Sequence, residues 1–146
     1  MTERITAEQR RLNMAAVRAK DTGPERAVRS ILHRLGLRFR LHQRGLPGTP
    51  DIVLKRHKVV VFVHGCFWHH HDCPRGKLPS TRTDFWVPKL QRNAERDKAN
   101  AALLRRLGWR VLTVWECELR EPRKLVRRLA RAFGVRTAPL SDTKRR

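Results

Sequence analysis

Acidic residues are scarce in this sequence. Its 146 residues include 13 Asp and Glu against 34 Lys and Arg, which gives a formal net charge of +21. A compact domain with this excess of positive charge repels itself, so a polyanionic partner is expected. Nucleic acid is the usual partner, because Lys and Arg contacts to phosphates release condensed counterions. The alternative is a well-solvated basic surface without a specific partner.

Long apolar runs are also missing. No stretch approaches the roughly 18–20 apolar residues that a membrane span requires, and the N-terminus is polar at Thr2, Glu3 and Arg4. Three cysteines with uneven spacing argue against a disulfide framework and favour metal ligands or buried thiols. We therefore expect a soluble, intracellular protein, and its hydrophobic fraction of 40% is enough for one folded core.

Apolar periodicity divides the chain into helices and strands, which predicts one α/β domain over residues 21–134 with a sheet flanked by helices. A partly helical basic arm over residues 1–20 and a basic tail over 135–146 flank this domain. The expected elements are helix 24–35, strands 37–42, 51–54 and 58–64, an irregular insertion over 65–88, helix 88–107, strand 109–115 and helix 122–133.

Asp51 and His64 are candidates for one site. Asp51 follows a Gly- and Pro-rich loop at the mouth of a strand, where it either projects into a cleft or merely forms a turn. His64 ends the long apolar strand, a position that also suits a core histidine. A hairpin turn at residues 55–57 would place Asp51 beside His64 and favours the functional interpretation of both.

Asp97 and Glu25 lie in line with the apolar residues of their helices. Asp97 continues the apolar series of helix 88–107 and therefore points inward. An inward carboxylate needs a hydrogen-bond donor, a metal or a cation such as an Arg side chain. Glu25 is also in line with apolar residues, but the segment from Thr22 to Glu25 fits a capping box, in which Glu25 would bond the helix cap. The spacing alone favours this structural role over a functional one.

The segment from Gly65 to Cys73 is rich in metal-binding side chains. A structural Zn²⁺ takes four Cys or His ligands in a tetrahedron. A buried thiol cluster beside a solvated histidine run is the alternative, and it accounts less well for three adjacent histidines next to two cysteines. The candidate ligands are Cys66, His71, Cys73 and the distant Cys117.

Two histidines and three aromatic residues of the same region remain. Either His69 or His70 can be a general base that activates water, because imidazole titrates near neutral pH. Phe67, Trp68 and Trp86 lie among basic residues, where exposed rings stack on bases or wedge between base pairs. Packing in the core is the ordinary alternative for such rings.

Together these motifs resemble those of the very short patch repair (Vsr) endonucleases. The resemblance covers residues 10–125, and its most specific element is the run from His64 to His71. The matching segments are Asn13-Met14, Asp21-Thr22, Leu46-Pro47-Gly48, Pro50-Asp51, Phe62 to His71, Thr81-Arg82-Thr83, Phe85-Trp86, Asn93, Glu95-Arg96-Asp97, Gly108 to Leu112 and Val114 to Cys117.

The resemblance implies a restriction-endonuclease-like α/β fold of the variant PD-(D/E)xK type, with a central mixed sheet flanked by helices and a zinc-bound insertion over residues 65–88. It implies catalytic Mg²⁺ on Asp51 and the main-chain carbonyl of Val63, a position that is often Thr in relatives. The remaining implied roles are His69 as general base, His64, Asp97 and Glu25 in support, Cys66, His71, Cys73 and Cys117 as Zn²⁺ ligands, and Phe67, Trp68 and Trp86 as intercalating rings.

The implied activity is a nick in double-stranded DNA, 5′ to the mismatched T of a T:G pair that arises by deamination of 5-methylcytosine. A monomer in the bacterial cytoplasm, associated with the nucleoid, is expected, with mismatch-repair proteins and a repair polymerase as further partners. The alternatives are a non-catalytic, zinc-stabilised DNA-binding protein and a restriction-type nuclease of the same fold. The segment Pro74-Arg75-Gly76-Lys77 and the short basic tail depart from the family pattern.

Overall fold

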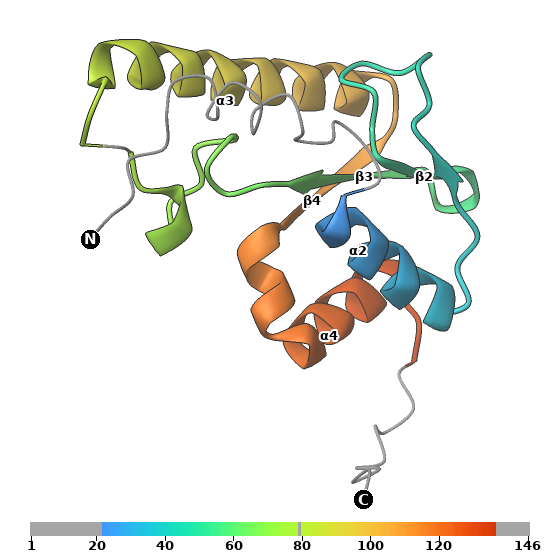
Figure 1. Ribbon diagram of the computed structural model, residues 1–146. Helices are drawn as coiled ribbons and strands as arrows, with labels where there is room; N and C mark the ends of the chain where they lie inside the picture. The colour runs from blue at the N-terminus through green and yellow to red at the C-terminus, as the bar shows by residue number, and fades with distance from the viewer. Residues whose placement is uncertain (1–21, 79, 137–146) are drawn as a thin grey trace, which may run out of the picture.

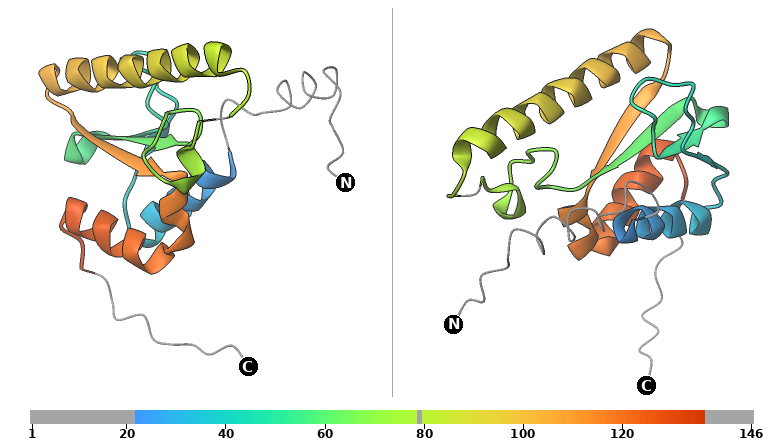
Figure 2. Two further views of the ribbon diagram at one scale, coloured as in Figure 1. Left: turned by 90° about the vertical axis from the view of Figure 1, so that its left-hand side faces the viewer. Right: turned by 45° about the horizontal axis from the view of Figure 1, so that its top comes forward.

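A sheet between two layers of helices organises the computed structural model, which describes residues 22–78 and 80–136 (Figure 1). Helix α3 (Thr83–Arg106) covers one face of the sheet, and helices α2 (Gly23–Arg34) and α4 (Pro122–Phe133) lie on the other. The two further views agree with this arrangement (Figure 2). The predicted arm over residues 1–20 and most of the predicted tail lie outside the described residues.

The sheet has four strands in the order β1-β2-β3-β4, and its last pair is parallel while the others are antiparallel. The predicted mixed sheet is therefore confirmed. Short 3-10 turns follow three of the elements: η1 (Lys55–His57), η2 (Pro74–Gly76) and η3 (Glu116–Arg120). The strands are β1 (Arg40–Leu41), β2 (Ile52–Leu54), β3 (Val59–His64) and β4 (Arg110–Trp115).

Strand β3 forms the centre of the molecule because it is buried on both faces, as its unbroken apolar run predicts. Val59 and Val61 belong to the larger core, which the sheet shares with α2 and α4. Val60 and Phe62 face the opposite way, into a smaller core with Leu104 of α3. Side chains that alternate along β3 therefore contribute to both cores, one on each face of the sheet.

Helix α2 begins and ends within one residue of the predicted bounds, 24–35. The Thr22 hydroxyl accepts a hydrogen bond from the Glu25 backbone N–H at 3.3 Å, and Pro lies in the first turn, where no N–H donor is required. Gly36 follows the helix with a φ of +77°, a left-handed conformation that glycine adopts without a Cβ clash. These caps fix the position of Glu25 at the start of the helix.

Two of the predicted boundaries were wrong. The strand expected over 37–42 pairs with its neighbour only at Arg40–Leu41, because His42 adopts a φ of +47° and ends the extended conformation. Helix α3 begins at Thr83, not at Pro88, so the irregular insertion is shorter than expected. Pro88 is exposed near the first turns of the helix, where it removes a single backbone hydrogen bond.

Among the described residues, no helix is long and apolar enough to cross a membrane. The 24 residues of α3 have sufficient length, but charged side chains interrupt them throughout.

The packing of α3 on the sheet gives a matched pair of variants. Leu104 is fully buried, whereas its neighbour Leu103 is 46% exposed. Leu104→Ala should lower the free energy of unfolding by about 2–5 kcal/mol, because it removes buried methyl groups and leaves a cavity. Leu103→Ala should change it by less than about 0.5 kcal/mol. Urea titrations of both variants measure this difference, and equal losses would contradict the inward orientation of Leu104.

Candidate active site and metal centre

An open cleft of 1370 Å³ lies between α3 and the ends of α2, β2 and β3. The five residues predicted to carry catalysis all line it, although they come from four separate segments of the chain. Basic side chains line it as well, which suits a phosphate-rich substrate. The predicted residues are Glu25, Asp51, His64, His69 and Asp97, and the basic ones are Arg44, Arg96, Lys98 and Arg105.

Asp51 directly precedes β2, and the hairpin brings it beside the end of β3, as predicted. Its Oδ2 atom accepts a hydrogen bond of 2.8 Å from the backbone N–H of Val63. The N–H and C=O of one strand residue point to the same edge, so the Val63 carbonyl also faces Asp51. Burial raises the pKa of Asp51 to about 6, although the Val63 hydrogen bond opposes this shift.

His69 and Asp97 form a hydrogen-bonded pair across the cleft. Nδ1 of His69 lies 2.5 Å from Oδ2 of Asp97, which is 28 residues away in the sequence. Asp97 therefore points inward, as predicted, and its partner is a histidine, not an arginine. Since Nδ1 is held by a carboxylate, Nε2 is left as the proton-accepting nitrogen of the ring. His70, the other candidate base, is exposed and has a φ of +52°.

His64 packs flat against His69 in the same cleft. The two ring centroids are 3.7 Å apart and the planes differ by 3°. His64 is 8% exposed, and burial together with the neighbouring His69 lowers its pKa to about 4. His64 is consequently uncharged at neutral pH, and it fixes the orientation of the His69 ring by stacking.

Glu25 also lines the cleft, close to two residues that the sequence did not single out. Its Oε2 atom is 3.1 Å from Nη2 of Arg29 and 3.7 Å from Nε2 of His42. Thr22 caps the helix through the Glu25 backbone N–H, which is one half of the predicted capping box, while the carboxylate of Glu25 is buried beside Asp51. The Glu25 backbone can therefore serve the helix cap while its side chain lies in the cleft.

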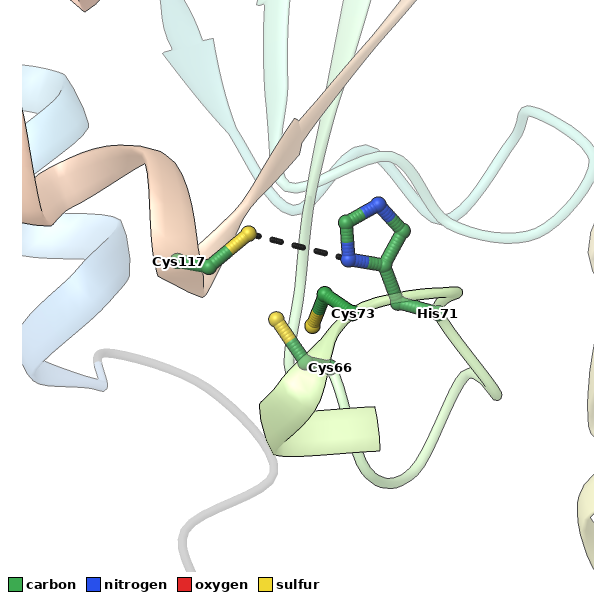
Figure 3. Close-up of side chains that lie close together, drawn as sticks. All are labelled: Cys66, His71, Cys73 and Cys117. Atoms are coloured by element: carbon green, nitrogen blue, oxygen red, sulfur yellow. Dashed lines mark hydrogen bonds between the residues drawn. The ribbon is translucent and has the colours of Figure 1, made fainter. Parts of the chain in front are cut away.

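The four predicted zinc ligands converge where the loop after β3 meets the start of η3 (Figure 3). Their ligand atoms all lie within 4.8 Å of one another. Nδ1 of His71 is 3.6 Å from Sγ of Cys117, which matches the separation of about 3.6 Å between N and S ligands on a tetrahedral Zn²⁺. Burial raises the pKa of Cys66 to about 12, so a bound metal is needed to form its thiolate at neutral pH. The donor set and spacing fit Zn²⁺.

The parallel pairing of β3 and β4 explains why Cys117 joins this group. His64 is paired with Trp115 in the register of the two strands. Cys66 and Cys117 each follow two residues later, so both lie just beyond the same end of the two paired strands. Cys66 and Cys117 are 51 positions apart in the sequence, yet their Sγ atoms lie within 4.8 Å of each other.

The three predicted intercalating aromatics form a partly exposed cluster next to the cleft. Phe67 lies 5.2 Å from Trp68 and 5.3 Å from Trp86, measured between ring centroids. Two further members were not assigned from the sequence. Phe85 is 44% exposed and packs against Trp86, and the Lys89 ammonium lies 5.7 Å from the Trp68 ring. The start of α3 at Thr83 places Phe85 and Lys89 one helical turn apart.

Comparison with known proteins agrees with this geometry. Residues 2–75 match the model of the family described as DNA mismatch endonuclease Vsr. The chain belongs to this family. It is 54% identical over 129 residues to the type II nicking enzyme V.XorIIP of Xanthomonas oryzae pv. oryzae, covering 88% of this chain and 95% of that enzyme. It is 50% identical over 113 residues to DNA mismatch endonuclease Vsr of Escherichia coli (strain K12), covering 77% and 72%.

The Vsr-family chain also resembles a solved structure, the catalytic domain of the homing endonuclease I-Bth0305I. The TM-score is 0.52 and the sequence identity 22%, over 76% of this chain and 93% of that domain. The likeness shows the fold, and the predicted restriction-endonuclease-like α/β class is confirmed. Family membership makes the protein a DNA mismatch endonuclease, so the non-catalytic alternative is wrong.

Asp51→Asn should stabilise the protein at neutral pH in the absence of added Mg²⁺. Because the pKa of Asp51 is raised in the folded protein, the protonated carboxyl favours folding at pH values below its ordinary pKa of 3.8. This contribution is lost as the pH rises through about 6. At pH 7.5 the amide should therefore add about 1–3 kcal/mol to the free energy of unfolding, and near pH 4 the gain should vanish. Urea titrations at both pH values measure it; a variant less stable than wild type at pH 7.5 would contradict the assignment.

Gly76→Ala should reduce the zinc content. A Cβ at Gly76 would lie 1.8 Å from the His71 backbone oxygen and 3.2 Å from that of Cys66, and backbone atoms of the metal loop cannot move aside. At Gly65 an added Cβ would make only ordinary contacts at 3.6 Å, so Gly65→Ala should keep its zinc. Elemental analysis of the purified variants compares them, and full zinc occupancy in Gly76→Ala would refute this role of the loop.

Proposed function

We propose that the protein nicks one strand of double-stranded DNA, 5′ to the mismatched T of a T:G pair, by Mg²⁺-dependent hydrolysis. The observation that carries the proposal is the His69–Asp97 pair, which faces the same cleft as the buried Asp51. The relative from Escherichia coli is named a mismatch endonuclease, which supports the choice of substrate.

The surroundings of Asp51 fit a catalytic Mg²⁺. A buried carboxylate with a raised pKa, close to a second carboxylate at Glu25, gains stability from a cation. Mg²⁺ prefers oxygen ligands, and the candidates here are the Asp51 carboxylate and the Val63 carbonyl. When bound, the ion would neutralise the negative charge that develops on the phosphate during hydrolysis.

The His69–Asp97 pair fits the task of activating water. In this proposal Nε2 of His69 removes a proton from the attacking water. The water oxygen bonds to phosphorus as the P–O bond to the leaving sugar oxygen breaks, and that sugar oxygen takes up a proton from solvent. Asp97 holds the ring in the required tautomer and stabilises the imidazolium that forms. His64 restricts the ring by stacking at 3.7 Å without adding a charge, because its pKa is well below neutral.

Mismatch preference is assigned to the aromatic cluster of Phe67, Trp68 and Trp86. Apolar side chains that wedge between base pairs kink the duplex. A duplex with a mismatched base pair resists this deformation less than a fully paired duplex. Zn²⁺ on the four Cys and His ligands would hold the loop that carries Phe67 and Trp68, without a part in the chemistry. One cleft per chain is sufficient for a single nick, so a monomer is the expected active form.

Strand-resolved cleavage of an end-labelled duplex with one T:G mismatch tests the proposal, beside a fully paired twin. We expect a single Mg²⁺-dependent nick 5′ to the mismatched T, and weak or no cutting of the twin. Equal cutting of both duplexes would favour a restriction-type nuclease of the same fold.

Asp97→Asn should lower the single-turnover rate of this nick by about 10²- to 10⁴-fold, because the amide no longer supports the charged form of His69. Glu121→Gln, on the exposed start of α4, is the control for loss of one carboxylate and should retain the wild-type rate. An unchanged rate in Asp97→Asn would remove His69 from the role of base.

A further inference from the structure

The exposed face of α4 carries a series of basic side chains. From Pro122 to Arg136 the sequence contains six basic residues and no acidic one. The opposite face of the helix is buried in the larger core through Leu125, Leu129 and Phe133, which fixes the orientation of α4 on the sheet. We call four of the exposed residues the basic ridge: Arg123, Lys124, Arg127 and Arg131.

The spacing of the basic ridge suits a repeating anionic partner. Arg123, Arg127 and Arg131 recur every four residues, which corresponds to about 6 Å along an α-helix. At about 100° of rotation per residue, these three and Lys124 fall within an arc of about 100° on one side of the helix. Each strand of duplex DNA carries one phosphate per about 3.4 Å of its axis, so successive ridge side chains match about every second phosphate.

The stability of the helix does not account for the basic ridge. Like charges three or four residues apart repel each other, and Arg123 and Lys124 lie in the first turn, where the helix dipole favours anions. Lys124 lies 3.5 Å from Glu121, but these side chains are 84% and 67% exposed, so water screens the pair. Arg128 differs from the ridge, because it bonds Glu118 and thereby ties α4 to η3. A polyanion bound along the ridge would offset the repulsion.

The basic ridge lies outside the catalytic cleft. Within the part of the chain that the structure describes, no residue of α4 lines the cleft. Helix α3, which forms one wall of the cleft, covers the opposite face of the sheet from α4 (Figure 1). DNA in the cleft and DNA on the ridge would therefore contact different surfaces of the protein.

We propose that the basic ridge of α4 binds the phosphate backbone of a second segment of duplex DNA while the cleft holds the first. Its side chains are cations that contact phosphates, so this binding is independent of base sequence. A protein that holds two segments passes from one to the other without complete dissociation. The inference goes beyond the proposed function: it rests on the DNA endonuclease family of the chain, not on the mismatch, the strand or the catalytic ion.

Energy transfer between two labelled duplexes tests the second surface. The full-length, zinc-loaded protein is first bound to a donor-labelled hairpin with one T:G mismatch, without added Mg²⁺, and an acceptor-labelled, fully paired duplex is then added. We expect energy transfer for the wild type. Arg127→Gln combined with Arg131→Gln should weaken capture of the second duplex by about 10-fold, and should lower the slope of log affinity against log salt by about 1.8 for two lost phosphate contacts.

Two further variants separate the ridge from the general charge of the protein. Arg92→Gln combined with Arg106→Gln removes two exposed arginines of α3 that do not line the cleft, and should capture the second duplex as the wild type does. Arg127→Lys combined with Arg131→Lys keeps both charges and should also retain capture. All three double variants should bind the first hairpin with wild-type affinity and keep their zinc, which shows that they are folded.

Three outcomes would overturn the inference. The first is a wild type that gives no energy transfer, and the second is equal capture by the wild type and by Arg127→Gln/Arg131→Gln. The third is a wild-type complex that binds labelled polyglutamate but no second duplex, which would assign the ridge to an acidic protein. The proposed function is judged separately, because its failure appears as equal binding and cutting of mismatched and fully paired hairpins.

Discussion

The parallel pairing of β3 with β4 is the constraint on which the rest of the structure depends. It aligns the ends of two strands that are distant in the sequence, with His64 opposite Trp115. Two residues beyond this pair, the chain supplies Cys66 and Cys117 to the candidate metal centre. The antiparallel hairpin on the other side of β3 adds Asp51, through the hydrogen bond from Val63. Both candidate metal positions therefore lie at the same end of the sheet, where β3 and β4 end and β2 begins.

A continuous set of ring contacts connects the metal loop to the catalytic cleft. His71 stacks on Trp115 with centroids 4.0 Å apart, and Trp115 meets His64 edge-on at 5.3 Å. His64 in turn stacks on His69. A metal ion bound to His71 would therefore restrict the same aromatic packing that orients His69.

The charge of the chain is distributed in two layers around the cleft. The strongly basic surface attracts DNA at long range, and basic side chains line the cleft itself. Inside this basic lining lies a small group of carboxylates at Glu25, Asp51 and Asp97, each with a neighbouring imidazole. The net charge favours encounter with a polyanion, while the carboxylates of the cleft provide oxygen atoms that could hold a cation.

The sequence by itself determined the central strand, the capped helix α2, the inward direction of Asp97 and the members of the Cys and His cluster. Each is a local pattern: a period of two, a capping motif, a helical period or a dense run of Cys and His. Only the tertiary structure brought Asp97 to His69 and placed His42 beside Glu25 and Arg29, because these contacts join residues 13 to 28 positions apart. It also decided that α3 starts before Pro88, since one lost hydrogen bond costs less than the aromatic contacts that the added turn provides. Contacts between distant segments leave no periodicity in the chain, and they arise only when strand register sets which side chains meet.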